Sequence, residues 1–269
     1  MTPFLKWAGG KRQLLETLKC NMPKDYNVYY EPFLGAGALF LSVQPMVAIL
    51  GDINKQLINL WLNVRDNLDI LILAISWLDR TSCTKERYQL IRKQYNSLKD
   101  KQITATAATM LWLNKHCFNG LWRVNSKGDF NVPWNKKKDG CNLDLKNLTL
   151  ISTFLQGSVT IKNAPYQETC SSAIAGDFVY LDPPYDPVSK TANFTAYTQD
   201  LFSDKDQQEL ATLVKELSEK QVKVMISNND TDFIRELYKD YDIIAIPVRR
   251  SISRDGTTRT GKEVLIKNY

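Results

Sequence analysis

The stretch Asp177-Phe178-Val179-Tyr180-Leu181-Asp182-Pro183-Pro184-Tyr185 joins a run of apolar residues to a polar, proline-rich end. A short apolar run followed by turn residues predicts a buried strand. Asp182 to Tyr185 are therefore expected where this strand ends, which is where ligands bind in open α/β sheets. Because prolines fix φ and lack a backbone N–H, the loop offers carbonyl acceptors beside a carboxylate and an aromatic ring. Such a corner suits the exocyclic amino group of a planar ring, such as a nucleobase.

Six further apolar segments resemble strands, and helical patterns lie between several of them. The strand candidates cover residues 28–32, 46–51, 159–162, 222–227, 243–248 and 264–267, and the clearest helices cover 204–220 and 231–238. Alternating strands and helices predict a mostly parallel sheet. The last two candidates are close enough to form an antiparallel hairpin with a long loop. The expected fold class is therefore α/β, a mostly parallel, Rossmann-like sheet whose last strand is antiparallel.

The middle of the chain has a different character. Residues 54–109 follow a helical pattern with few glycines, and residues 118–134 are aromatic and rich in turn signals such as Asn119-Gly120 and Val132-Pro133. We expect an insertion after the second strand. The predicted division is a catalytic domain made of residues 1–54 and 149–269, and a target-recognition domain of residues 55–148 that carries a basic hairpin at 118–138.

Composition limits the possible classes of protein. The 269 residues are 43% hydrophobic, which allows a sizeable core, and they contain one histidine, His116, too few for a histidine-based metal site. The five cysteines include no Cys-x-x-Cys pair, and we find neither a signal peptide nor a membrane span, so reduced thiols in the cytoplasm are expected.

The net charge of +6 is mild, but its distribution is uneven. Basic residues gather in two clusters, which are either solvated faces or sites for phosphate. The first cluster comprises Lys115, Arg123, Lys127, Lys136, Lys137 and Lys138, and the second comprises Arg249, Arg250, Arg254 and Arg259.

Two glycine-containing segments resemble nucleotide-binding turns. In Glu31-Pro32-Phe33-Leu34-Gly35-Ala36-Gly37, the glycines at a strand-to-helix turn would let a ligand approach the backbone, and Asp52 at the next strand tip could accept from ribose hydroxyls. The third glycine of a dinucleotide fingerprint is missing, which favours a nucleoside without a pyrophosphate. Asp52 could instead cap the helix that begins near Asn54.

The second such segment is Phe4-Leu5-Lys6-Trp7-Ala8-Gly9-Gly10-Lys11, which precedes a predicted helix. Helix N-termini attract anions, Lys11 could complete such a site, and Trp7 could stack on a ring. The alternative is a flexible N-terminal segment with a core tryptophan.

Taken together and in order, these motifs resemble the Dam-type bacterial DNA adenine-N6 methyltransferases of the D12 class. The resemblance spans essentially the whole chain. It rests on segments 4–11, 31–40, 52–54, 118–121, 130–133, 182–185, 192–197, 227–228 and 249–253.

The resemblance implies S-adenosylmethionine as methyl donor, S-adenosylhomocysteine as product and no metal. It implies transfer to N6 of an adenine flipped out of double-stranded DNA, usually within GATC. The expected catalytic residues are Asp182, Pro183, Pro184 and Tyr185. The expected cofactor site comprises Trp7, Gly9, Gly10, Lys11, Glu31, Phe33, Gly35, Gly37, Asp52 and Asp182.

The expected DNA contacts come from the hairpin and from two later segments. They are Phe118, Asn119, Leu121, Arg123, Pro133, Lys136, Lys137, Lys138, Asn193, Tyr197, Arg249, Arg250 and Arg254. The hairpin departs from the family in two places: Trp134-Asn135-Lys136-Lys137 replaces the usual Phe-Gly-Arg-Tyr, and Phe118 replaces a common tyrosine. The target sequence is therefore open.

Other functions compete with this hypothesis. They are methylation of another amino group (cytosine N4, RNA or a protein glutamine), a DNA-binding module without activity, and a dinucleotide-dependent oxidoreductase. The intact Asp182 and Tyr185, the basic insertion and the missing third glycine favour the DNA methyltransferase. No Pro-Cys nucleophile motif is present, which argues against cytosine C5 chemistry. We further expect a monomer, no membrane association and a cytoplasmic location at the bacterial nucleoid.

Overall fold

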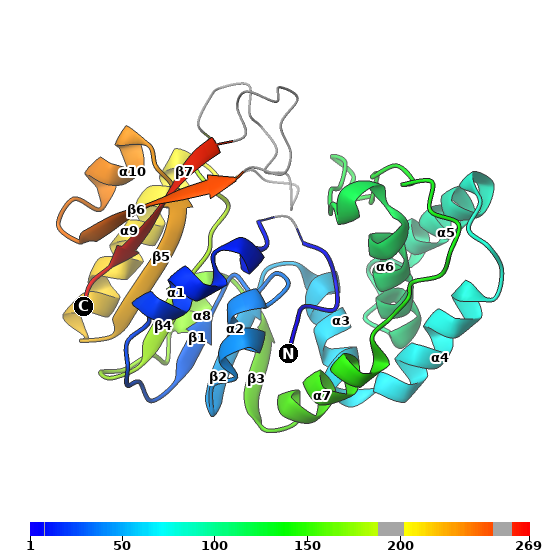
Figure 1. Ribbon diagram of the computed structural model, residues 1–269, viewed down its shortest axis with the longest axis horizontal. Helices are drawn as coiled ribbons and strands as arrows, with labels where there is room; N and C mark the ends of the chain where they lie inside the picture. The colour runs from blue at the N-terminus through cyan, green and yellow to red at the C-terminus, as the bar shows by residue number, and fades with distance from the viewer. Residues whose placement is uncertain (8, 188–201, 250–259) are drawn as a thin grey trace.

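The computed structural model describes residues 1–7, 9–187, 202–249 and 260–269. Within them, seven strands form one sheet in the order β3-β2-β1-β4-β5-β7-β6 (Figure 1). The strands are β1 (Tyr29–Glu31), β2 (Val47–Asp52), β3 (Ser158–Asn163), β4 (Phe178–Leu181), β5 (Lys223–Asn229), β6 (Asp242–Arg249) and β7 (Thr260–Lys267). Strands β1 to β5 are parallel, and β7 runs antiparallel to both β5 and β6. The α/β sheet and its antiparallel last strand are confirmed.

Strand β4 is buried on both faces, which explains why it is apolar without interruption. In β4, Phe178 and Tyr180 belong to one hydrophobic cluster, and Val179 and Leu181 belong to the other. The first face is covered by α1 (Leu15–Asn21), α2 (Ala38–Val43), α3 (Lys55–Asp66) and α7 (Leu145–Leu155). The second face is covered by α8 (Tyr166–Cys170), α9 (Asp204–Glu219) and α10 (Asp232–Leu237).

A helical insertion leaves the sheet between β2 and β3. It contains α4 (Leu68–Asp79), α5 (Lys85–Leu98), α6 (Thr104–His116) and the short 3-10 turn η2 (Phe118–Gly120). These helices stand to one side of the sheet (Figure 1), and their buried residues continue the cluster on its first face. Trp112 and Trp122 are both buried there. His116 is also buried and lies between the carbonyls of Trp112 and Asp139, which makes it structural.

The predicted hairpin is held by two isolated antiparallel bridges, Cys117 to Trp134 and Val124 to Phe130, instead of regular strands. Its base is fixed to α5: Asn96 accepts from the Phe130 backbone N–H at 2.9 Å and donates to the Phe130 carbonyl at 3.1 Å. Buried Trp122 and Phe130 pack together with their ring centroids 4.9 Å apart. The hairpin therefore has a firm aromatic base although it lacks a ladder.

The sheet order places a topological switch point between β1 and β4. From β1 the chain continues to β2 on one side, and from β4 it continues to β5 on the other. In such sheets the crevice outside the carboxyl ends of the two central strands is the expected ligand site. Glu31 ends β1 and Asp182 directly follows β4, so the two predicted sites lie at this crevice.

Candidate active site

Lys11 and Asp182 meet at the carboxyl end of β4, although they are far apart in sequence. Lys11 opens the short 3-10 helix η1 (Lys11–Gln13). Its buried ammonium Nζ lies 2.8 Å from Asp182 Oδ1 and 4.5 Å from the centroid of the Tyr185 ring, and it donates to the Gly9 carbonyl at 2.8 Å. A carboxylate, a cation and an aromatic face therefore share one corner.

Burial raises the pKa of Asp182, and the neighbouring Lys11 ammonium opposes this effect by stabilising the charged form. The Asp182 side chain is 19% exposed, while its Oδ1, the oxygen that faces Lys11, is buried. The ion pair thus favours the ionised Asp182 that can accept a hydrogen bond from an amino group.

The loop after β4 is fixed by side chains from the neighbouring elements. Gln207 of α9 donates to the Pro184 carbonyl at 3.0 Å, and the Asp186 backbone N–H donates to Asn228 at 3.1 Å. Buried Asn228 in turn donates to Gln207 at 3.2 Å. Within the described part of the chain, no group donates to the Pro183 carbonyl. Of the two proline carbonyls, only that of Pro183 therefore remains available to a ligand.

The glycine turn after β1 is tied to the tip of β2 by Asp52. Its Oδ2 accepts from the Gly35 N–H at 3.0 Å, and its Oδ1 accepts from the Asn54 N–H at 2.8 Å. Burial raises the pKa of Asp52 to about 6, and these two backbone hydrogen bonds oppose the shift. Asn54, and not Asp52, caps α3, because the Asn54 side chain accepts from Gln56 and Leu57. The helix-cap alternative for Asp52 is wrong.

Gly35 and Gly37 are both needed for steric reasons. Both have positive φ, at 48° and 61°. A Cβ on Gly35 would lie 2.9 Å from Trp7, and one on Gly37 would lie 3.0 Å from Trp61. The turn therefore presents bare backbone beside two indole rings.

Glu31 and Phe33 occupy different surroundings at the end of β1. Glu31 is buried and accepts from the Tyr29 hydroxyl at 2.6 Å and from the Phe40 N–H at 3.2 Å. Burial raises its pKa to about 8, and the Tyr29 hydrogen bond partly opposes the rise. Phe33 stacks on Tyr166 with centroids 5.3 Å apart. Glu31 thus adds a proton-binding acid to the crevice, and Phe33 adds part of an aromatic wall.

The N-terminal segment is packed against the protein. Phe4 and Leu5 are buried, and Trp7 is partly buried with its ring stacked on Trp122, centroids 5.8 Å apart. The alternative of a loose N-terminal segment is therefore wrong for residues 4–7.

Most of the predicted DNA contacts in the hairpin are exposed side chains. Asn119-Gly120 forms a turn in which both residues have positive φ, and it presents Phe118, which is 49% exposed. Arg123 is exposed, and its Nε donates to Asn131 at 2.7 Å. The other exposed members of the set are Asn119, Pro133, Lys136 and Lys138, and Leu121 is partly buried.

Lys137 differs from its two neighbours. It is partly buried, and its ammonium donates to the Gly140 carbonyl at 3.0 Å. Lys136 and Lys138 are exposed. The three consecutive lysines therefore do not form one uniform cationic run.

Comparison with known proteins agrees with this geometry. Residues 7–252 match the family described as D12 class N6 adenine-specific DNA methyltransferase. The chain belongs to this family. It is 38% identical to the type II methyltransferase M1.LlaDCHI of Lactococcus lactis subsp. cremoris, covering 100% of this chain and 96% of that protein. It is 37% identical to the DNA adenine methylase of Escherichia coli strain K12, covering 99% of this chain and 94% of that protein.

The type II methyltransferase M.MjaIII of Methanocaldococcus jannaschii is 38% identical over 99% of both chains. Family and relatives together establish an enzyme that methylates adenine N6 in DNA. The alternatives of an oxidoreductase, of an inactive module and of a different amino substrate are set aside.

Some residues of this DNA adenine methyltransferase were not anticipated from sequence. Glu263 in β7 accepts from the Tyr185 hydroxyl at 2.9 Å. The signal was available: an antiparallel last strand begins at the edge where the parallel strands end, and Glu263 lies near its start, opposite Asn229 of β5. Asn228 falls in segment 227–228, which contributed to the resemblance, but no role was predicted for it. Gln207 carried no comparable signal, since it is a common polar residue in a predicted helix.

Part of the predicted DNA surface falls outside the description. Asn193, Tyr197, Arg250, Arg254 and Arg259 lie outside the described residues, and Arg249 is the last residue of β6. The described residues also contain no helix that is long and apolar enough to cross a membrane.

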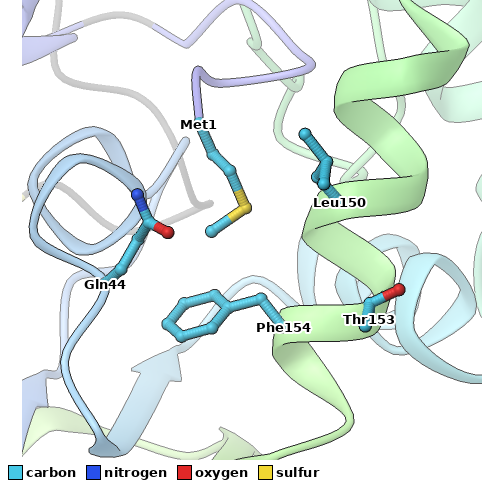
Figure 2. A pocket seen from close by; sticks show the side chains of 5 residues that line it. All are labelled: Met1, Gln44, Leu150, Thr153 and Phe154. Carbon is cyan, nitrogen blue, oxygen red and sulfur yellow. The ribbon is translucent and has the colours of Figure 1, made fainter.

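A shallow pocket lies apart from the predicted site. Its lining comes from Met1, Gln44 at the end of α2, and the α7 residues Leu150, Thr153 and Phe154 (Figure 2). None of these residues belongs to the predicted catalytic, cofactor or DNA-contacting sets, and none carries a charged side chain. The pocket therefore adds nothing to the chemistry of the corner.

Proposed function

We propose that this methyltransferase uses S-adenosylmethionine and acts on an adenine that has left the DNA duplex, with Asp182 to Tyr185 as the cup for the base. The observation that supports this most is the Lys11–Asp182 ion pair beside the Tyr185 ring at the β1/β4 switch point. An enzyme that modifies a base edge must remove the base from the stack. The partly exposed corner at the sheet edge is suited to receive it.

The crevice beside β1 has the groups that such a donor requires. Asp52 is positioned for ribose hydroxyls, the bare turn at Gly35 allows close approach, and Trp7 borders that turn. Glu31 and Asp182 place two carboxyl groups near a cationic ligand. When bound, S-adenosylmethionine supplies a methyl group on a positively charged sulfur. We assign Trp7, Gly9, Gly10, Lys11, Glu31, Phe33, Gly35, Gly37, Asp52 and Asp182 to this site.

The residues of the corner prepare the adenine amino group for attack. The lone pair on N6 is delocalised into the ring, so the free base is a poor nucleophile. Asp182 accepts one N6–H, which returns electron density to the nitrogen, and the Pro183 carbonyl is available for the second. Tyr185 stacks on the ring, and its hydroxyl is held by Glu263. The contribution of these groups is orientation and electrostatic stabilisation, without a covalent intermediate.

Recognition of duplex DNA is assigned to residues 55–148, with the remaining residues forming the catalytic domain. Arg123 pairs with a guanine edge, and Phe118 fills the space left by the base. The other DNA contacts are Lys136, Lys138, Asn193, Tyr197, Arg249, Arg250 and Arg254. Lys137 is left out of this set because its ammonium is bonded to the Gly140 carbonyl. GATC is the proposed target, because the hairpin has the order of motifs seen in the Dam type. A location at the nucleoid follows from the proposed DNA substrate, and a monomeric state is part of the same proposal.

The test is methylation of mixed-sequence duplex DNA with a labelled methyl donor, followed by mapping of modified adenines. The expected result is N6-methyladenine within GATC and much less label on the same DNA as single strands. Methylation of adenine within another motif would contradict the proposed GATC target and leave the rest of the proposal unchanged. Loss of all adenine label with a folded enzyme would overturn the proposal.

A further inference from the structure

Asn114, near the end of α6, is a buried polar side chain that the proposed chemistry does not use. It is 1% exposed. Its Oδ1 accepts from the Lys6 N–H at 2.9 Å, and its Nδ2 donates to the Lys6 carbonyl at 2.7 Å and to the Gly120 carbonyl at 3.1 Å. Both ends of one amide are therefore satisfied by backbone groups from two other segments.

The segments that Asn114 joins are the N-terminal strap, defined as residues 4–7, and the turn η2 of the hairpin. They are in close backbone contact, because a Cβ on Gly120 would lie only 2.4 Å from Lys6 Cβ. The strap is anchored at its start, where Phe4 packs edge-on to Trp61 with centroids 4.9 Å apart. In Figure 1 the dark blue N-terminal segment passes between the helices that cover the sheet and those of the insertion.

The far end of the strap contacts both proposed ligand sites. Trp7 fills the space next to Gly35 of the cofactor turn and stacks on Trp122 at the base of the hairpin, with 20° between the rings. A shift of the strap would therefore move the wall of the cofactor crevice and the support of the DNA-contacting turn together.

We infer that Asn114 is a positioning residue that locks the strap to the DNA-contacting turn, so that cofactor and DNA stabilise one shared arrangement. The inference rests on the proposed function, which assigns Trp7 to the cofactor and η2 to the DNA. Two ligands that favour the same arrangement strengthen each other's binding by equal factors. Removal of the Asn114 amide leaves two carbonyls and one N–H without the partners they have now, and the Gly120 carbonyl is buried, which favours separation of the strap from the turn.

The experiment measures the Kd of a short duplex with one GATC site, with and without saturating S-adenosylhomocysteine. For the unmodified enzyme, the product should tighten DNA binding by at least about fivefold, the lower end of typical coupling. Asn114→Ala should reduce this factor to less than about twofold. The matched control is Asn59→Ala, which removes an equally buried asparagine that bonds to Ile103 and Thr106 within the insertion, and it should keep the full factor.

A second variant acts from the other side of the same contact. Gly120→Ala places a methyl group in the buried contact between the turn and Lys6 and should also abolish the coupling, so it decides the question if Asn114→Ala does not fold. Full coupling in a folded Asn114→Ala or Gly120→Ala enzyme would overturn the inference, as would its absence from the unmodified enzyme. Failure of the unmodified enzyme to bind either ligand would instead refute the proposed function.

Discussion

The catalytic corner and the hairpin are built in opposite ways. At the corner, the reacting groups are largely enclosed and already bonded to one another: Lys11 holds Asp182, and Glu263 holds Tyr185. On the hairpin, the buried residues Trp122 and Phe130 form a base, and the residues proposed to meet DNA project from it with few protein partners.

This difference follows from the two tasks. Electrostatic preorganisation requires dipoles and charges that are fixed before the substrate arrives. A surface that contacts DNA sequence requires unpaired donors that can exchange water for base edges. Substitutions at the corner should therefore change the rate on every sequence, whereas substitutions on the hairpin should change which sequences are used or how strongly they bind.

The largest effect is expected from Asp182→Asn. The amide keeps the shape but loses the charge that Lys11 pairs with and that N6–H donates to. Methylation should fall by at least about 100-fold, the scale of a positioned acid–base group, while the Kd for DNA stays within about tenfold. Single-turnover methylation and equilibrium DNA binding measure the two quantities. Asp144→Asn, at the exposed cap of α7, is the matched control and should be fully active. Near-normal turnover by Asp182→Asn would refute its role.

Arg123→Ala should give the next largest effect, confined to specificity. Loss of a bidentate pair to guanine should reduce discrimination at one base pair by about 1–3 kcal/mol. Competition between GATC and its single-base variants measures this change. Arg80→Ala, on the exterior of α4 where the guanidinium covers Trp77, should leave discrimination unchanged. Equal weakening on all sequences would make Arg123 a phosphate contact.

The three consecutive lysines of the hairpin differ in their surroundings: Lys136 and Lys138 are exposed, whereas Lys137 is hydrogen-bonded within the protein. Lys136→Ala with Lys138→Ala should reduce the slope of log K against log salt by up to about 1.8, because each phosphate contact contributes about 0.9. Lys137→Ala should barely change the slope, since its ammonium is already bonded to Gly140. Binding titrations from low to moderate salt provide the slopes. A larger change for Lys137 than for the pair would contradict this assignment.

The sequence predicted the two regions to different depths, for a physical reason. Strand β4 and the Asp182 corner were predictable because a fully buried strand is uniformly apolar and its end is marked by an acid and two prolines. The pairing of Lys11 with Asp182 was not predictable, because it depends on how η1 is placed over the sheet. Lys136 and Lys137 are adjacent and identical in type, so only the backbone path decides which ammonium folds back to Gly140.

Asn114 shows the same limit in another form. An asparagine in a helical pattern predicts neither burial nor a partner, since its bonds are to the backbone of Lys6 and Gly120 and leave no trace in side-chain type. The position of Glu263 was easier to predict, because it directly precedes the predicted last strand at residues 264–267. Contacts made through backbone groups or across distant segments require the fold, whereas apolar runs and turn residues do not.

The smallest effect should appear in stability at the catalytic side, through Glu31. Its pKa is raised from 4.5 to about 8, so the folded state holds a proton that the unfolded chain releases between these values. The contribution of Glu31 to stability is therefore fully present below about pH 4.5 and is lost as pH rises to about 8, and Asp52 adds a separate contribution that is lost by about pH 6. Glu31→Gln, which cannot ionise, should flatten this decline.

The measurement is Tm across pH 5 to 8 for both proteins, where about 1 kcal/mol corresponds to about 2–4 °C. As pH rises, the Tm of Glu31→Gln should increase by a few degrees relative to that of the unmodified enzyme. The control Glu16→Gln replaces an exposed acid of α1, and its Tm should change with pH as that of the unmodified enzyme does. No corresponding slope should come from the exposed side chains of the hairpin, because they lose little solvent on folding. If Tm changed with pH in the same way for Glu31→Gln and the unmodified enzyme, Glu31 would be ionised in the folded protein. The contrast between an enclosed corner and an open hairpin would then depend on the Lys11–Asp182 pair alone.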